Sequence, residues 1–252
     1  MSLTLFTIGG IHLRQCFIKI RCWLVCVCGR AGKSGYTSRV ALDSLVLINR
    51  LPKTDGQGLA MAVSGGIGAG KSTVSATLAE LGAQVVSADQ ISHDLTAGDG
   101  DALPPIRAAF GSAVFRADGS LDRQQLAKRV FGDDEARARL ERIMHPLIQA
   151  RARSFLDAVE PGKVRVYDIP LLVETGFETD LVLIVWAPLQ VRVQRLIGRG
   201  LSEDEARARM AAQVSDTERL QVADVVVNNS GKQEEVRRAI EEVLWPRLLE
   251  RA

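Results

Sequence analysis

The feature that most constrains this chain is a glycine-rich run over residues 65–72, with the sequence Gly-Gly-Ile-Gly-Ala-Gly-Lys-Ser. It fits the phosphate-loop pattern, which is a Gly, four residues of any kind, and then Gly-Lys-Ser or Gly-Lys-Thr. An apolar stretch over residues 59–64 precedes the run, and a helix-forming stretch over residues 72–81 follows it. This context predicts a strand, a loop that wraps a phosphate, and a helix whose N-terminus faces the same anion.

The residue types in this run all suit phosphate binding. Glycine tolerates positive φ and lets backbone N–H groups approach an anion closely. Lys71 would place a positive charge on the β- and γ-phosphates of a nucleotide, and the Ser72 hydroxyl suits a Mg²⁺ ligand. We therefore predict Mg²⁺ as the cofactor and Ser72 as its ligand. The predicted ATP-binding residues are Gly65, Gly66, Gly68, Ala69, Gly70, Lys71, Ser72 and Thr73.

A second Gly-Lys-Ser lies earlier in the chain, at residues 32–34. The phosphate-loop pattern requires a Gly five positions before Gly32, and Val27 stands there instead. A loop at this place would be too short to wrap a phosphate, so we exclude it as a nucleotide site.

Strand and helix patterns alternate from residue 59 to the C-terminus. Expected strands span residues 59–64, 84–88, 164–169, 181–187 and 224–228, and the clearest expected helices span residues 72–81, 189–199, 203–222 and 233–249. This alternation predicts an α/β fold of the P-loop NTPase class, with a parallel sheet flanked by helices and ligands beyond the carboxyl ends of the strands. Because about 75 mostly helix-like residues separate the second and third strands, we expect an inserted helical substrate subdomain over about residues 90–160.

The first 58 residues do not fit this alternation, and we assign them to an N-terminal extension of a domain that spans residues 59–252. Residues 1–60 hold eight Lys and Arg against two acidic residues, and they hold all four cysteines. Three interpretations stay open: sequence translated from too early a start, with Met61 as the true first residue, a targeting peptide, or a disordered tail. The expected location is cytoplasmic, or organellar if a transit peptide is real.

Other classes of protein are disfavoured by the remaining sequence. After the phosphate loop there are no D-x-x-G and N-K-x-D motifs of GTPases, and no L-S-G-G-Q signature of transporter ATPases. Residues 61–252 carry 28 Asp and Glu against 24 Lys and Arg, which disfavours nonspecific nucleic-acid binding. No stretch approaches the roughly 18 apolar residues of a membrane span. A helical insertion and an Arg-rich late segment are typical of small-molecule kinases, whose lid excludes water, and we expect that lid over about residues 195–212.

Several short sequences follow one another from about Met61 to the C-terminus. They are Ser-Gly-Gly-Ile-Gly-Ala-Gly-Lys-Ser-Thr over residues 64–73, Ala88-Asp89, His-Pro-Leu-Ile over 145–148, Ile-Pro-Leu-Leu-Val-Glu over 169–174, Gln213 with Arg219, and Ala223-Asp224 leading to Asn228. In these pieces, their order and their spacing, the sequence resembles the dephospho-CoA kinase family. One departure is Ser87, because family members often carry an acid two places before the aspartate. The resemblance implies ATP-dependent phosphorylation of the ribose 3′-hydroxyl of dephospho-CoA, the last step of coenzyme A biosynthesis.

The resemblance also implies catalytic roles for Lys71, Asp89, Arg195 and Arg199. Asp89 would be the base, or the hydrogen-bond acceptor, that orients the 3′-hydroxyl, and a helix N-cap is the alternative. Arg195 and Arg199 lie at the lid, where one or both would close over the transferring phosphate, and a solvated helix face is the alternative.

Substrate binding is expected from Asp89 together with His93, His145, Pro170 and Leu171. A single His is more often a packing or capping residue than a catalyst, so the two histidines rest mainly on the resemblance. Asp168 is a candidate to hold Mg²⁺ through water, as acids on neighbouring strands do in P-loop enzymes.

The expected partners are therefore ATP and dephospho-CoA, and we expect a monomer or weak homo-oligomer that binds neither nucleic acid nor membranes. One rival function is a kinase of the same architecture that acts on a nucleoside or nucleoside monophosphate. Another is a nucleotide-dependent switch or binding protein, which would bind ATP but release no stoichiometric ADP. Tests with different acceptors separate these three hypotheses.

Overall fold

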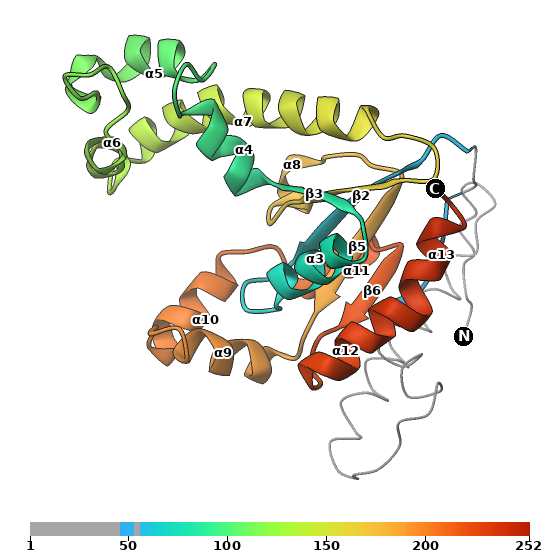
Figure 1. Ribbon diagram of the computed structural model, residues 1–252. Coiled ribbons are helices and arrows are strands. Elements are labelled where there is room, and N and C mark those ends of the chain that lie inside the picture. Colours follow the sequence, from blue (N-terminus) through green and yellow to red (C-terminus); the bar gives the residue numbers. More distant parts are fainter. Residues whose placement is uncertain (1–45, 53–55) are drawn as a thin grey trace, which may run out of the picture.

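The computed structural model describes residues 46–52 and 56–252, and these form a six-stranded sheet with helices on both faces (Figure 1). The predicted α/β architecture is confirmed. The strands are β1 (Val46–Ile48), β2 (Leu59–Gly65), β3 (Gln84–Ser87), β4 (Val164–Asp168), β5 (Leu181–Trp186) and β6 (Val225–Asn228). The helices outside the insertion are α3 (Lys71–Glu80), α8 (Leu172–Thr175), α9 (Leu189–Ile197), α10 (Glu203–Ala211), α11 (Asp216–Gln221), α12 (Gln233–Ala239) and α13 (Trp245–Leu249).

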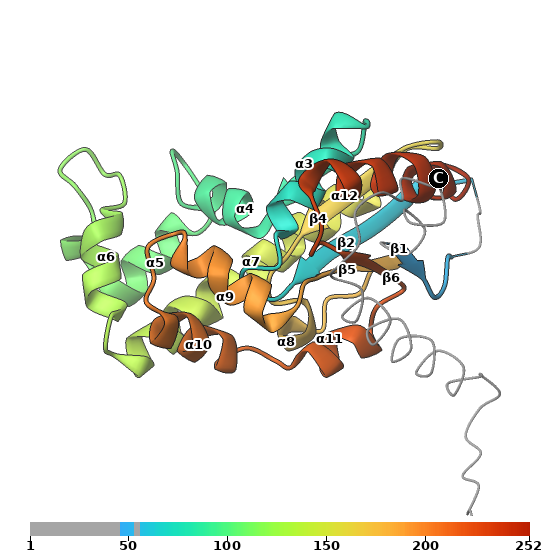
Figure 2. The same ribbon diagram turned by 90° about the horizontal axis from the view of Figure 1, so that it is seen from below.

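The strand that leads into the glycine-rich loop lies inside the sheet. The strand order is β1-β6-β5-β2-β4-β3, so β2 has β5 on one side and β4 on the other. All neighbouring pairs from β6 to β3 are parallel, and only β1 runs antiparallel, against β6 (Figure 2). The carboxyl ends of the parallel strands therefore gather at one edge of the sheet, and the loop after β2 sits at that edge.

Both faces of the sheet are buried, which explains why its strands read as continuous apolar runs. Met61 and Val63 belong to a core that includes residues of α3, α12 and α13, whereas Ala62, between them, belongs to a second core beneath α4, α7 and α8. The same alternation holds in β5, where Leu183 faces the first core and Ile184 the second. Each strand thus stabilises two layers of helices and holds the loop after β2 in a rigid frame.

The long connection between β3 and β4 is helical, as expected, and projects from one end of the sheet (Figure 1). Its buried side chains include Leu95, Ile106, Leu126 and Met144, one from each of its four α-helices. All four residues belong to the second core, which also contains Ala62 and Ile184 of the sheet. The insertion therefore packs as a continuation of that core. The helices are α4 (Ala88–Leu95), α5 (Leu103–Phe110), α6 (Arg123–Val130) and α7 (Asp134–Asp157).

The prediction of a single helix over residues 203–222 is wrong, because the structure has two helices there, α10 and α11. Ser215 is the N-cap of α11. Its hydroxyl accepts from the Glu218 N–H at 3.2 Å, and the Glu218 carboxylate accepts from the Ser215 N–H at 2.8 Å. This capping box starts a new helix at Asp216. The expected helix over residues 233–249 also contains a π-helical segment, Ile240–Leu244, between α12 and α13.

Part of the N-terminal extension joins the sheet. Val46–Ile48 pair with β6, and Val46 is buried with 5% of its surface exposed. The backbone N–H groups of Asn49 and Arg50 donate to the Asp224 carbonyl at 2.8 and 3.2 Å, and the Arg50 guanidinium pairs with the Asp224 carboxylate at 2.7 Å. The three interpretations were offered for residues 1–60, of which residues 1–45 and 53–55 lie outside the described residues. In the described ranges, no helix is both long and apolar enough to cross a membrane.

Candidate active site

The predicted phosphate loop connects β2 to α3 at the carboxyl edge of the sheet. Gly70 has a φ of 87°, in the left-handed region, and Lys71 begins the helix immediately after it. A Cβ on Gly70 would collide with the Asn229 side chain. Backbone N–H groups of the loop and of the first helical turn are therefore available to an anion, in the arrangement that the motif predicts.

The loop is held from outside through its carbonyl groups. The Arg195 guanidinium donates to the carbonyls of Gly68 and Ala69 at 3.3 and 3.1 Å, and the Asn229 amide donates to the Ala69 carbonyl at 2.8 Å. Arg195 also donates to the Asn229 carbonyl at 2.7 Å. These bonds fix the shape of the loop. Two of its amides are already engaged, since the Ala69 N–H donates to the Gly66 carbonyl at 3.0 Å and the Ile67 N–H donates to the Gln213 side chain at 2.9 Å.

The two arginines that the sequence assigned to the lid differ in position. Arg195 lies in the last turn of α9, on the phosphate loop, and burial lowers its pKa, as does the nearby charge of Arg199. Arg199 lies beyond the end of α9 and is exposed. The structure thus brings Arg195 to the loop carbonyls and leaves Arg199 at the surface.

The loop lysine is paired with an acid from the neighbouring strand. Lys71 forms an ion pair with Asp168, the last residue of β4, whose side chain is 8% exposed. The other carboxylate oxygen of Asp168 accepts from the Ser75 hydroxyl of α3 at 2.7 Å. Asp168, a candidate magnesium residue in the sequence, therefore lies beside both Lys71 and the first turns of α3.

Asp89 faces the same region from the other side of β4. It lies in the first turn of α4, and the cap of that helix is Ser87, whose hydroxyl accepts from the Gln90 N–H at 3.0 Å. The helix-cap alternative for Asp89 therefore fails, and the residue that departs from the family pattern does the capping. Asp89 is exposed.

The charge of Asp89 acts on two residues of the loop region. Burial lowers the pKa of Lys71, and the negative charge of Asp89 opposes that shift. Burial also raises the pKa of Tyr167 to about 12, with a further contribution from Asp89. The site thus combines a half-buried lysine and an exposed carboxylate, whereas Tyr167 is 1% exposed and belongs to the core.

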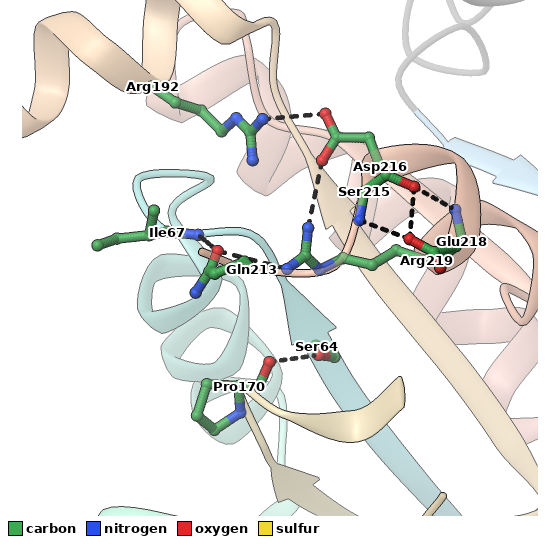
Figure 3. A network of polar contacts seen from close by, with 9 residues as sticks. All are labelled: Ser64, Ile67, Pro170, Arg192, Gln213, Ser215, Asp216, Glu218 and Arg219. Carbon is green, nitrogen blue, oxygen red and sulfur yellow. Dashed lines mark hydrogen bonds and ion pairs between the residues drawn. The ribbon is translucent and has the colours of Figure 1, made fainter. Parts of the chain in front are cut away.

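The remaining predicted substrate residues are spread over three elements. Pro170 follows β4, and its carbonyl accepts from the Ser64 hydroxyl of β2 at 3.4 Å, so Pro170 lies next to the start of the loop (Figure 3). Leu171, the next residue, is exposed. His93 is exposed in the last turn of α4, and His145 is exposed in α7. The histidines therefore belong to the insertion, one from each of two helices that contact each other.

Sequence reasoning missed a polar network on the other side of the loop. The Gln213 side-chain oxygen accepts from the Ile67 N–H at 2.9 Å and from the Arg219 guanidinium at 3.3 Å. Asp216 accepts from Arg192 at 3.0 Å and from Arg219 at 3.4 Å (Figure 3). Gln213 and Arg219 were noted in the resemblance without a role, and no motif marked Arg192 or Asp216.

Comparisons with known proteins identify the family. A model of the dephospho-CoA kinase family matches residues 59–235. A dephospho-CoA kinase from Frankia casuarinae is 47% identical over 193 residues, covering 76% of this chain and 84% of that protein. Mycobacterial relatives are longer, and the chain spans about half of their length.

Solved structures agree with this result. A crystal structure from Thermus thermophilus is 34% identical, with a TM-score of 0.61, and covers 75% of this chain and 98% of its own. A dephospho-CoA kinase from Campylobacter jejuni is 26% identical, with a TM-score of 0.56, and covers 75% and 97% respectively. The sequence match and the shared fold lead to one conclusion: this chain belongs to the dephospho-CoA kinase family.

Proposed function

We propose that this chain transfers the γ-phosphoryl group of ATP to the ribose 3′-hydroxyl of dephospho-CoA through the residues gathered at the phosphate loop. The observation that carries the proposal is that the phosphate loop and the insertion meet at the carboxyl ends of β4 and β3. Lys71 pairs with Asp168 at the end of β4. The residue opposite Asp168 on β3 is Ser87, two positions before the Asp89 carboxylate. The lysine belongs to the phosphate loop and the carboxylate to the first turn of the insertion, so the phosphate side and the acceptor side of a kinase site meet there.

The overall chemistry follows from the family, since its reaction is the ATP-dependent final step of coenzyme A biosynthesis. In the proposed step, the 3′-oxygen forms a bond to the γ-phosphorus while the bond from that phosphorus to the β,γ-bridging oxygen breaks. ADP leaves with the electron pair of the broken bond, and the hydroxyl proton passes to the Asp89 carboxylate. Such a transfer depends mainly on positioning and on stabilisation of charge.

The phosphate loop binds the nucleotide in this proposal. Its amides and the N-terminus of α3 face the phosphates, and Lys71 adds a positive charge. Arg195 keeps the loop in shape through the carbonyls of Gly68 and Ala69, and Arg199, at the exposed end of α9, is the lid arginine free to move over the phosphates. Pro170, Leu171, His93 and His145 are proposed to border the acceptor.

The residues near the loop suit a magnesium ion. The exposed Ser72 hydroxyl, at the start of α3, and the Asp168 carboxylate are hard oxygen donors of the kind that Mg²⁺ prefers. Ser72 would bind the ion directly and Asp168 through water. When bound with ATP, Mg²⁺ would neutralise charge on the β- and γ-phosphates.

The test is a coupled assay of ADP release by the purified chain with Mg-ATP, with and without dephospho-CoA, and with adenosine and AMP as control acceptors. Release that depends on dephospho-CoA, with CoA detected by mass, supports the proposal. Release with a control acceptor alone would keep the kinase and reject the acceptor. ATP binding with no release would favour the nucleotide-binding protein. We also propose a monomer or weak homo-oligomer in the cytoplasm, which light scattering and cell fractionation would check.

A further inference from the structure

A buried ion network lies against the start of the phosphate loop. The side chains of Arg192, on α9, and Arg219, on α11, are only 8% and 4% exposed. Asp216 lies between them, with one carboxylate oxygen 3.0 Å from Arg192 and the other 3.4 Å from Arg219 (Figure 3). One carboxylate is therefore shared by two guanidinium groups.

The charges in this network do not balance. Two guanidinium groups and one carboxylate leave a surplus positive charge, and the two positive members are the most buried. The Nε atom of Arg192 is buried and has no hydrogen-bond partner in the described part of the chain. Burial and the charge of Arg219 lower the pKa of Arg192, and Asp216 raises it, but a guanidinium stays protonated in a protein. A buried, incompletely paired cation is unfavourable unless an anion completes it.

The network touches the loop directly. A side chain on Gly66 would collide with the Arg192 guanidinium and would closely approach that of Arg219. Gln213 links the same assembly to the loop, because its side-chain oxygen accepts from both the Ile67 N–H and Arg219. A larger residue at position 66 would thus displace the Arg192 guanidinium from its present place beside the loop.

The surplus charge borders an open hollow. A cavity of about 390 Å³ lies between α9, α10 and α11, and both buried arginines line it, together with exposed Arg207. An anion that enters there would reach two guanidinium groups that are already held by Asp216. Guanidinium groups bind phosphate through paired N–H groups, so a phosphoryl group matches this site in charge and in geometry.

We propose that Arg192 and Arg219 form a second phosphoryl-binding subsite beside the phosphate loop, with Asp216 as the residue that positions them. This inference rests on the proposed kinase function. The phosphoryl group comes from one of two sources, the terminal phosphate of ATP or a phosphate of the acceptor. In either case the subsite binds a phosphoryl group other than the one that the glycine-rich loop surrounds.

The experiment compares Arg192→Met with the control Arg238→Met. Arg238 does not line the hollow, is exposed on α12 and pairs with Glu242 on the surface at 3.6 Å, so its loss should change every constant less than twofold. For each variant we would measure the melting temperature, the Kd of ADP and of β,γ-imido-ATP by calorimetry, and the steady-state constants with dephospho-CoA.

A nucleotide source predicts that Arg192→Met binds ADP as the unchanged chain does, binds β,γ-imido-ATP at least tenfold more weakly, and has a kcat about 10²-fold lower. An acceptor source predicts unchanged nucleotide affinities and an at least tenfold higher KM for dephospho-CoA. Equal loss of ADP and β,γ-imido-ATP affinity, or no change in any constant, would overturn the subsite.

Two further features keep the test decisive. If Arg192→Met does not fold, Arg192→Gln places a neutral amide near the position of the Arg192 Nε atom and should show the same losses. The contrast between ADP and β,γ-imido-ATP needs no acceptor. A chain that gave this contrast but did not phosphorylate dephospho-CoA would therefore retain the subsite while the proposed acceptor was rejected.

Discussion

Residues 46–60 should contribute measurably to stability, and two truncated chains test this. One starts at Val46 and the other at Met61, so they differ only in the segment that supplies β1 and the first two residues of β2. The shorter chain loses the Leu59 side chain, which is 1% exposed, and truncation of a buried leucine to alanine costs about 2–5 kcal/mol.

The shorter chain also loses the β1–β6 pairing, the Asn49 and Arg50 donors to the Asp224 carbonyl, and three backbone donors near the start of β2. The N–H groups of Gly58, Leu59 and Ala60 donate to the Ala252 carbonyl, the Lys163 carbonyl and the Asp180 carboxylate at 2.8, 2.9 and 3.1 Å. Each such bond contributes about 1 kcal/mol. Some of this loss is offset, because fewer residues are ordered on folding. A net loss of about 5 kcal/mol is expected, which corresponds to a melting temperature roughly 10–20 °C lower for a domain of this size.

Thermal unfolding followed by circular dichroism would measure this difference. In the chain from Val46, Leu59→Ala should account for most of the loss, whereas Arg50→Ala should change stability by at most about 1 kcal/mol, because Arg50 is 67% exposed in its ion pair. Melting temperatures within 2 °C for the two truncated chains would refute the reasoning and would make Met61 a sufficient start for the fold.

Two other substitutions test the site. Asp89→Asn should lower kcat by about 10²–10³-fold while ATP affinity stays within threefold, since Asp89 is exposed and Ser87 caps its helix. Asp94→Asn on the same helix is the control. Loss of ATP binding in Asp89→Asn would show that Asp89 has a structural role. Gly70→Ala should weaken ADP binding at least tenfold in a fluorescence titration, because the new Cβ adds backbone strain at φ 87° and displaces the Asn229 side chain. Gly82→Ala is the control, because Gly82 has a φ of 110° and open space around it. This variant should have a lower melting temperature than the unchanged chain but should bind ADP normally. Equal ADP affinities in the two glycine variants would contradict the proposed role of Asn229.

The phosphate loop was predictable because its chemistry is local. A strand, four glycines, a lysine and a serine follow one another in the chain, and the conformation of each depends on its immediate neighbours. The buried strands were predictable for a similar reason, since a strand covered on both faces must be apolar throughout. Strand β1 was not predicted: it has three residues, and its partner β6 lies about 180 residues further along the chain. No local pattern marks such a pairing.

The contacts of Arg195 could not be predicted from the sequence, for a different reason. The resemblance assigned Arg195 to a lid over the transferring phosphate, and in the structure its guanidinium donates to the carbonyls of Gly68 and Ala69 in the loop. Sequence alone does not say whether a guanidinium near a phosphate loop contacts the phosphate or the loop carbonyls. Which of the two the guanidinium contacts depends on the distance between α9 and the loop. The Asn229 carbonyl, which follows β6, also accepts from the Arg195 guanidinium and helps to hold it against the loop.

The network of Arg192, Asp216 and Arg219 was missed because a helix-start signal in the sequence was not recognised. Ser215 and Glu218 form a capping box, the local signal for a new helix, within a run interpreted as one helix over residues 203–222. A helix that starts at Asp216 places Asp216 and Arg219 three residues apart on one face, which is the spacing of their ion pair. The break also frees Gln213 to reach the loop. A continuous helix would also have kept Asp216 and Arg219 three residues apart, but it would have enclosed Gln213, which instead lies between α10 and α11 and reaches the loop. Because this cap was not recognised, the sequence did not reveal the site now proposed to bind a phosphoryl group.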